Sequence, residues 1–96
     1  MIESFGNAVA EDLFEDKNSR ATRAFPTGLR RPARRKLQYL HEAADLSDLK
    51  SPPGNRLESL KGDFKGFHSI RINDQWRICF RWSNREARDV EIVDYH

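Results

Sequence analysis

Apolar and polar residues alternate along the last third of the chain, which is the pattern of β-strands that bury one face. Ile70 and Ile72 share one face of a first strand, with Arg71 on the other. Asn73-Asp74 fits a two-residue hairpin turn. Four apolar side chains then define the same face of a second strand: Trp76, Ile78, Phe80 and Trp82.

A third strand is expected after a polar turn over residues 83–88. Val90 and Ile92 match the apolar face, whereas Val93 falls opposite. The second face of the predicted antiparallel sheet would then display a different set of side chains: Arg71, Arg77, Cys79, Arg81 and Tyr95.

The first half of the chain predicts two helices after a short strand over residues 1–5. Asn7 can cap a helix that runs to about Lys17. Residues 18–28 contain a proline and a glycine and are expected to form a loop.

The second helix is expected over residues 29–46, with Pro32 tolerated in its first turn. One stripe of this helix is apolar: Ala33, Leu37, Leu40 and Ala44. The opposite stripe is polar and mostly basic: Arg31, Arg34, Arg35, Gln38 and Glu42. Residues 51–55, Ser-Pro-Pro-Gly-Asn, end helical structure.

These elements fit one small α+β domain over residues 1–96, with two N-terminal helices packed on a twisted antiparallel sheet. The sequence has no apolar run long enough for a membrane span and no signal-peptide pattern. Its one cysteine, Cys79, has no internal partner, which favours the reducing cytoplasm. No Cys/His set has zinc spacing, so no metal and no other cofactor is expected.

The net charge of +2 conceals an uneven distribution. Residues 1–16 hold five acids and no base, whereas residues 17–41 hold eight bases and no acid. A basic block of this kind suits a polyanion or an acidic protein, and it also suits a solvated helix face.

The arginine-bearing face of the sheet is the first candidate site. Arg71, Arg77 and Arg81 beside Tyr95 would neutralise phosphates and stack on the bases of single-stranded RNA. The alternative is an ordinary solvated sheet face.

The last three residues, Asp94-Tyr95-His96, are the second candidate site. RNA cleavage without a metal needs a base for the 2′-hydroxyl, an acid for the leaving 5′-oxygen and a cation at the phosphate. His96 can do acid or base work near neutral pH, Asp94 can orient it, and Arg77 can hold the phosphate. The alternative is a frayed terminus without a role.

These residues resemble a known family. The stretches Pro-Pro-Gly-Asn-Arg at 52–56, Leu-Lys-Gly-Asp at 60–63, Asn-Asp-Gln-Trp-Arg at 73–77 and the terminal Asp-Tyr-His together resemble HigB-type toxins, in particular a GraT-like subgroup. The similarity covers nearly the whole chain and is most specific from residue 52 onward.

The resemblance implies a RelE/ParE-like fold and the toxin of a type II toxin–antitoxin system. It implies a metal-independent, ribosome-dependent endoribonuclease that cleaves mRNA and inhibits translation and growth. The expected partners are the ribosome, mRNA and a HigA-like antitoxin with a helix-turn-helix domain, which alone would contact operator DNA.

Carried over by position, Arg77 resembles the phosphate-binding arginine, and Asp94, Tyr95 and His96 resemble the catalytic group. Lys61 resembles a supporting cation, and we add Arg71, Arg81 and Glu58 as RNA-binding candidates. Some relatives carry a histidine where this chain has Glu58. A carboxylate there could act as a base but would also repel phosphate, which predicts a weaker nuclease.

Two further functions fit the same fold. A ParE-like toxin would inhibit by binding, for example at a topoisomerase, and an RNA-binding toxin would act without cleavage. Codon-spaced cuts in mRNA would separate the nuclease from both.

Overall fold

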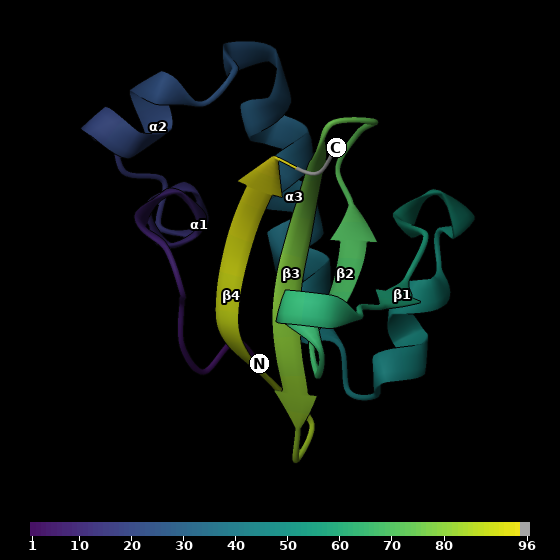
Figure 1. Ribbon diagram of the computed structural model, residues 1–96. Helices are drawn as coiled ribbons and strands as arrows, with labels where there is room; N and C mark the ends of the chain where they lie inside the picture. The colour runs from purple at the N-terminus through teal and green to yellow at the C-terminus, as the bar shows by residue number, and fades with distance from the viewer. Residues whose placement is uncertain (95–96) are drawn as a thin grey trace.

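The computed structural model describes residues 1–94. Four strands form one antiparallel sheet in the order β1-β2-β3-β4. Their bounds are β1 Glu58–Ser59, β2 His68–Arg71, β3 Trp76–Ser83 and β4 Glu86–Asp94. Helix α3 (Arg30–Glu42) packs on one face of the sheet, while α1 (Ala8–Phe14) and α2 (Arg20–Ala24) lie beyond the β4 edge (Figure 1). The predicted α+β architecture is confirmed.

The core lies between the sheet and the helices because the apolar faces predicted from the sequence meet there. Ile78, Phe80 and Ile92 supply its sheet side, and Leu37 and Leu40 of α3 supply its helix side. All five are at most 3% exposed, so the alternation in β3 and the stripe in α3 point to the same interior.

Asn7 joins the start of α1 to the last strand. Its Oδ1 accepts from the Ala10 amide at 3.2 Å, which confirms the predicted N-cap. The same side chain also bonds both backbone groups of Ile92 in β4. The strand expected over residues 1–5 is reduced to two isolated parallel bridges, which place Ile2 and Phe5 beside β4.

The prediction of a loop over residues 18–28 is wrong. This segment forms α2 and the start of a 3-10 turn, η1 (Thr27–Leu29). Ser19 and Thr22 form a reciprocal capping box at the start of α2. Two polar side chains thus begin a five-residue helix that has too few apolar positions to show a period.

Helix α3 ends at Glu42 rather than at residue 46. The Asp48 carboxylate accepts from the amides of Ala44 and Asp45, which starts a separate 3-10 helix, η2 (Leu46–Lys50). The backbone has already turned extended at Ala43, so Ala43 is buried and Ala44, predicted to lie on the apolar stripe, is exposed.

The tight two-residue hairpin lies between β3 and β4 and not at Asn73-Asp74. Asn84 and Arg85 have φ values of 51° and 63°, the left-handed conformation that such turns require. The polar turn predicted over residues 83–88 is therefore too long, because β4 already begins at Glu86. The β2–β3 connection is wider because the Asn73 side chain accepts from the amides of both Gln75 and Trp76.

A β-bulge explains why the alternation of buried and exposed side chains changes partway along β4. The register shifts between Cys79 and Arg81 of β3, and Asp89 opposite has a φ of 52°. The extra residue lets Ala87 and Val90 both face the interior, although they are three positions apart.

The second face of the sheet is less open than the sequence predicts. The connection from β1 to β2 contains a 3-10 turn, η4 (Gly62–Phe64), and crosses this face on the side away from α3 (Figure 1). Arg77 is only 8% exposed and Cys79 is fully buried, whereas Arg81 is exposed. Only part of the expected arginine face is therefore solvated.

Candidate active site

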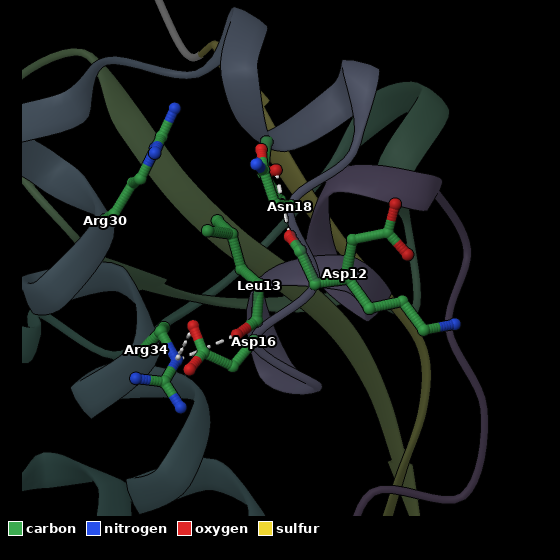
Figure 2. A pocket seen from close by; sticks show the side chains of 8 residues that line it. Asp12, Leu13, Asp16, Asn18, Arg30 and Arg34 are labelled. Carbon is green, nitrogen blue, oxygen red and sulfur yellow. Dashed lines mark hydrogen bonds and ion pairs between the residues drawn. The ribbon is translucent and has the colours of Figure 1, made fainter.

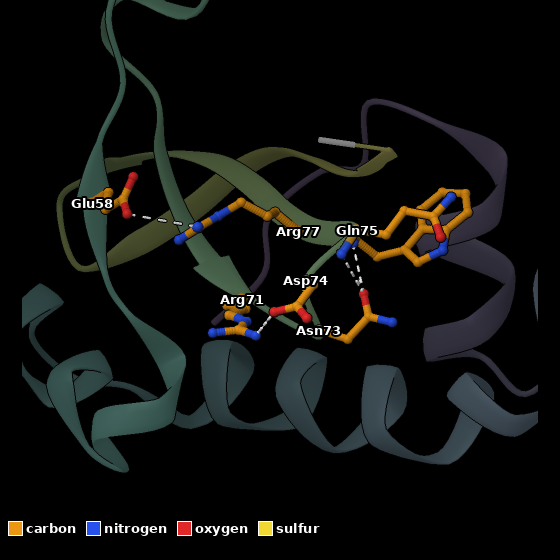
Figure 3. Close-up of polar contacts among 7 residues, drawn as sticks. Glu58, Arg71, Asn73, Asp74, Gln75 and Arg77 are labelled. Carbon is orange, nitrogen blue, oxygen red and sulfur yellow. Dashed lines mark hydrogen bonds and ion pairs between the residues drawn. The ribbon is translucent and has the colours of Figure 1, made fainter. Parts of the chain in front are cut away.

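A cleft of about 220 Å³ lies at the end of the sheet where β2 stops and β3 starts. Its lining is almost entirely charged or polar: Arg56, Glu58, Arg71, Asn73, Asp74 and Arg77. The β2–β3 register places Arg71 directly opposite Arg77, so both side chains leave the same face of the sheet (Figure 3).

Arg77 is the most constrained side chain in this cleft. Its Nη2 donates to the backbone carbonyl of Arg56 at 2.7 Å, and its Nη1 lies 3.6 Å from Oε1 of Glu58. The side chain extends along the sheet toward Glu58 (Figure 3). A guanidinium with little exposure interacts more strongly with a bound anion than a surface arginine does, because less water screens it.

Arg56 belongs to this cleft, although sequence reasoning did not select it. The 3-10 turn η3 (Pro53–Asn55) precedes it, and the Arg56 backbone is left-handed with φ 46° and ψ 57°. That conformation turns the Arg56 carbonyl toward Arg77 while the exposed side chain lines the cleft. The available signal was the Pro-Pro-Gly-Asn turn directly before an arginine.

The cleft carries more positive than negative charge. Three arginines line it, opposed by Glu58 and Asp74, of which Asp74 pairs with Arg71. The Glu58 and Asp74 side chains are 50% and 95% exposed, so their ion pairs are weak and can yield to a competing anion. The arrangement suits a phosphodiester that exchanges with these carboxylates.

Lys61 and Arg81, two other predicted site residues, do not line this cleft. Lys61 is exposed at the start of η4. Arg81 lies farther along β3, where its Nε is 3.4 Å from Asp89 and its guanidinium sits 4.6 Å above the Phe67 ring. The structure therefore brings together Glu58, Arg71 and Arg77 of the predicted set.

Asp94 ends β4 beside Trp76, its register partner, and accepts from Nε2 of Gln75 at 3.0 Å. The neighbouring Val93 pairs with Arg77, so Asp94 and Arg77 leave their strands on opposite faces at the same end of the sheet. Tyr95 and His96, the other two predicted catalytic residues, lie outside the described residues.

A second, smaller hollow of about 100 Å³ lies between α1, α2 and α3 (Figure 2). Acids and bases both line it, and Arg34 donates from Nε to the Leu13 carbonyl at 3.0 Å with Asp16 3.9 Å away. These contacts hold the end of α1 against α3. We therefore interpret the residues around the hollow as structural.

Cys79 and His68 are the titratable groups most affected by burial near the sheet centre. Burial raises the pKa of the Cys79 thiol to about 11, and Glu91 adds to this rise. The thiol is therefore protonated at neutral pH and a poor nucleophile, as expected for a passive cysteine. Burial also lowers the pKa of His68, the first residue of β2, whose Nδ1 lies 3.3 Å from the Ser59 hydroxyl.

Within residues 1–94, no three or more His, Cys, Asp or Glu side chains converge on a point where they could hold a metal ion. Over the same residues, every helix is too short or too polar to cross a membrane.

Comparisons with known proteins agree with this architecture. The family model described as the RelE-like toxin of the type II toxin–antitoxin system HigB matches residues 3–96. Toxin HigB-1 of Vibrio cholerae serotype O1 is 40% identical over 82 residues, which cover 85% of this chain and 84% of the relative. Endoribonuclease HigB of Proteus vulgaris is 34% identical over 61 residues, covering 64% of this chain and 65% of the relative.

Solved structures with the same fold have little sequence in common with this chain. A YoeB–YefM complex from Staphylococcus aureus aligns with a TM-score of 0.59 at 16% identity, over 100% of this chain and 98% of the matched chain. A YafQ variant from E. coli aligns with a TM-score of 0.58 at 14% identity, over 98% of this chain and 93% of the other.

Proposed function

The chain belongs to the HigB family of RelE-like toxins of type II toxin–antitoxin systems, and on this basis we propose that it is a metal-independent endoribonuclease. Its substrate is mRNA on the ribosome, and cleavage inhibits translation and growth. A relative, from Proteus vulgaris, is named an endoribonuclease. The observation that carries the proposal is the largely buried Arg77 at the centre of a cleft with two further arginines.

In this mechanism Arg77 binds the scissile phosphate and stabilises the negative charge that develops on it. The guanidinium is already directed by the Arg56 carbonyl, so it does not reorganise during the reaction. Arg56 and Arg71 contact the flanking phosphates, which supply affinity without sequence choice.

Acid–base chemistry is assigned to carboxylates and to the C-terminal group. Glu58 lies within reach of a phosphate held by Arg77, so its carboxylate can take the 2′-hydroxyl proton once RNA displaces it from the guanidinium. Tyr95 and His96 retain the role that the family resemblance implies, with His96 protonating the leaving 5′-oxygen. Asp94 leaves the sheet on the face opposite Arg77, so we assign it to orienting this group and not to contact with the phosphate. Lys61 and Arg81 are assigned to more distant phosphates.

The partners follow from the same proposal. A YoeB relative by fold was solved with YefM in a toxin–antitoxin complex, which supports an antitoxin as partner here; we propose a HigA-like one. The exposed basic face of α3, with Arg31, Arg34 and Arg35, suits ribosomal RNA and equally an acidic antitoxin segment. Action on ribosomes places the protein in the cytoplasm.

The test is cleavage of a defined mRNA by the purified protein with ribosomes, read by primer extension. We expect codon-spaced cuts, and a loss of roughly 10²–10⁴-fold when an acid–base group is removed. Arg77→Ala and His96→Ala should both abolish cleavage and growth inhibition while circular dichroism shows an intact fold. Full toxicity after deletion of His96 would refute its assignment.

The same assay separates the alternatives. Intact mRNA together with a DNA-damage response would favour a ParE-like toxin that acts by binding. Intact mRNA with tight RNA binding and no such response would favour a non-catalytic RNA-binding toxin.

A further inference from the structure

Helix α3 is linked to the turn before Arg56 through a buried asparagine. Asn55 is fully buried, and its Nδ2 donates to the carbonyls of Leu49 at 3.1 Å and Ser51 at 3.2 Å. Its Oδ1 accepts from Nζ of Lys36, which reaches it from α3. Both N–H groups of this amide donate to carbonyls that precede the turn, and its oxygen accepts from Lys36.

Lys36 is suited to hold this oxygen because it is partly withdrawn from water. Burial lowers the pKa of its ammonium, and the neighbouring Arg35 adds to the effect. An ammonium that has lost part of its hydration binds a protein acceptor more strongly, and an unpaired one in this position would be costly. The contact therefore fixes where the turn lies against α3.

Arg56, the residue after Asn55, makes the next contact in this series. Arg56 has the left-handed backbone that directs its carbonyl at Nη2 of Arg77, 2.7 Å away. A shift of Asn55 moves the adjoining Arg56 carbonyl, which is one of the groups that orient the Arg77 guanidinium. Lys36 does not line the cleft and is connected to Arg77 through Asn55 and Arg56.

We propose that Lys36 and Asn55 are positioning residues, which hold the Arg56 carbonyl in place and thereby set the direction of Arg77 in the cleft. The inference rests on the proposed role of Arg77 as the phosphate-binding group. Lys36 then governs the rate of the chemical step without contacting RNA, because displacement of a catalytic group by about 1 Å can cost on the order of 10²-fold in rate.

The test compares Lys36→Met with Lys65→Met, each of which removes one lysine charge. Lys36 contacts Asn55, whereas Lys65 is exposed in the connection from β1 to β2 and does not line the cleft. In the ribosome-programmed mRNA assay, we expect Lys36→Met to lower kcat by roughly 10–100-fold with little change in KM. Lys65→Met should leave kcat unchanged, and Lys36→Arg, which keeps a donor, should recover most of the loss. Equal kcat values for Lys36→Met and the unmodified protein, or Lys36→Arg as slow as Lys36→Met, would overturn the proposal.

A second readout does not depend on nuclease activity. In ¹⁵N NMR spectra of the full chain, the Arg77 side-chain signals should be shifted and broadened in Lys36→Met and unchanged in Lys65→Met. If the unmodified protein does not cleave mRNA, the proposed function fails while these spectra still decide whether Lys36 positions Arg77. Unchanged Arg77 signals in a folded Lys36→Met protein would refute the positioning role.

Discussion

Replacement of Asn7 by alanine should destabilise the protein more than the loss of an ordinary helix cap. The substitution removes the N-cap bond to Ala10, which contributes about 1 kcal/mol. It also removes the two bonds to the backbone of Ile92 in β4, which contribute roughly 0.5–1.5 kcal/mol each. The expected loss is therefore about 3 kcal/mol, and for a domain of this size the Tm should fall by roughly 12–24 °C.

The measurement is urea unfolding followed by tryptophan fluorescence, with Asn7→Ser as the matched control. Serine keeps the cap but is too short to reach Ile92, so Asn7→Ser should lose only the strand contribution, about 1–3 kcal/mol. The difference between the two variants then gives the cap alone. If Asn7→Ser is as stable as the unmodified protein to within about 0.5 kcal/mol, the bonds to β4 contribute nothing and the reasoning is wrong.

Three other predictions concern single side chains near the sheet. Glu58→Ala should slow mRNA cleavage by roughly 10²-fold or more if the carboxylate is the base, and Glu58→His should restore part of the rate; equal rates for all three proteins would exclude this role. Cys79, with its pKa raised to about 11, should resist iodoacetamide at pH 8 in the folded protein and react once urea unfolds it, so rapid labelling of the native state would contradict its burial. The pKa of His68 is lowered by burial, so its contribution to stability is present above pH 6.5 and is lost as the pH falls through the lowered value. The free energy of unfolding should therefore decline less between pH 7 and pH 5 in His68→Gln than in the unmodified protein. Identical pH profiles for the two proteins would contradict this role of His68.

The strand faces could be predicted because the period of two is a local property of the sequence. The alternation from Trp76 to Phe80 and the stripe through Leu37 required no knowledge of the rest of the chain, and both proved to face the core. Features that depend on side-chain hydrogen bonds to the backbone were missed. The start of α2 at Ser19 and the end of α3 before Asp48 are of this kind. In both, polar side chains bond the backbone and set the boundary of the helix, whereas the apolar pattern gives no sign of it.

The site could be predicted in part for the same reason. Arg71 and Arg77 have matching strand parity, so their shared face followed from the sequence, and the family resemblance added Glu58. The burial of Arg77 could not be foreseen, because it depends on a distant turn folding over the sheet. Arg56 was missed since its contribution comes from a backbone carbonyl in a left-handed conformation, which no side-chain pattern reveals.

The pairing of the first residues with β4 has a consequence for how the protein is made. Ser4 bonds Asp89, and Asn7 bonds Ile92, each pair 85 positions apart in the sequence. During synthesis the amino-terminal segment therefore cannot pair with β4 until nearly all of the domain has left the ribosome. Arg77 shares its register with Val93 of the same late strand, so the strand that carries Arg77 gains its second neighbour only after β4 has been synthesised.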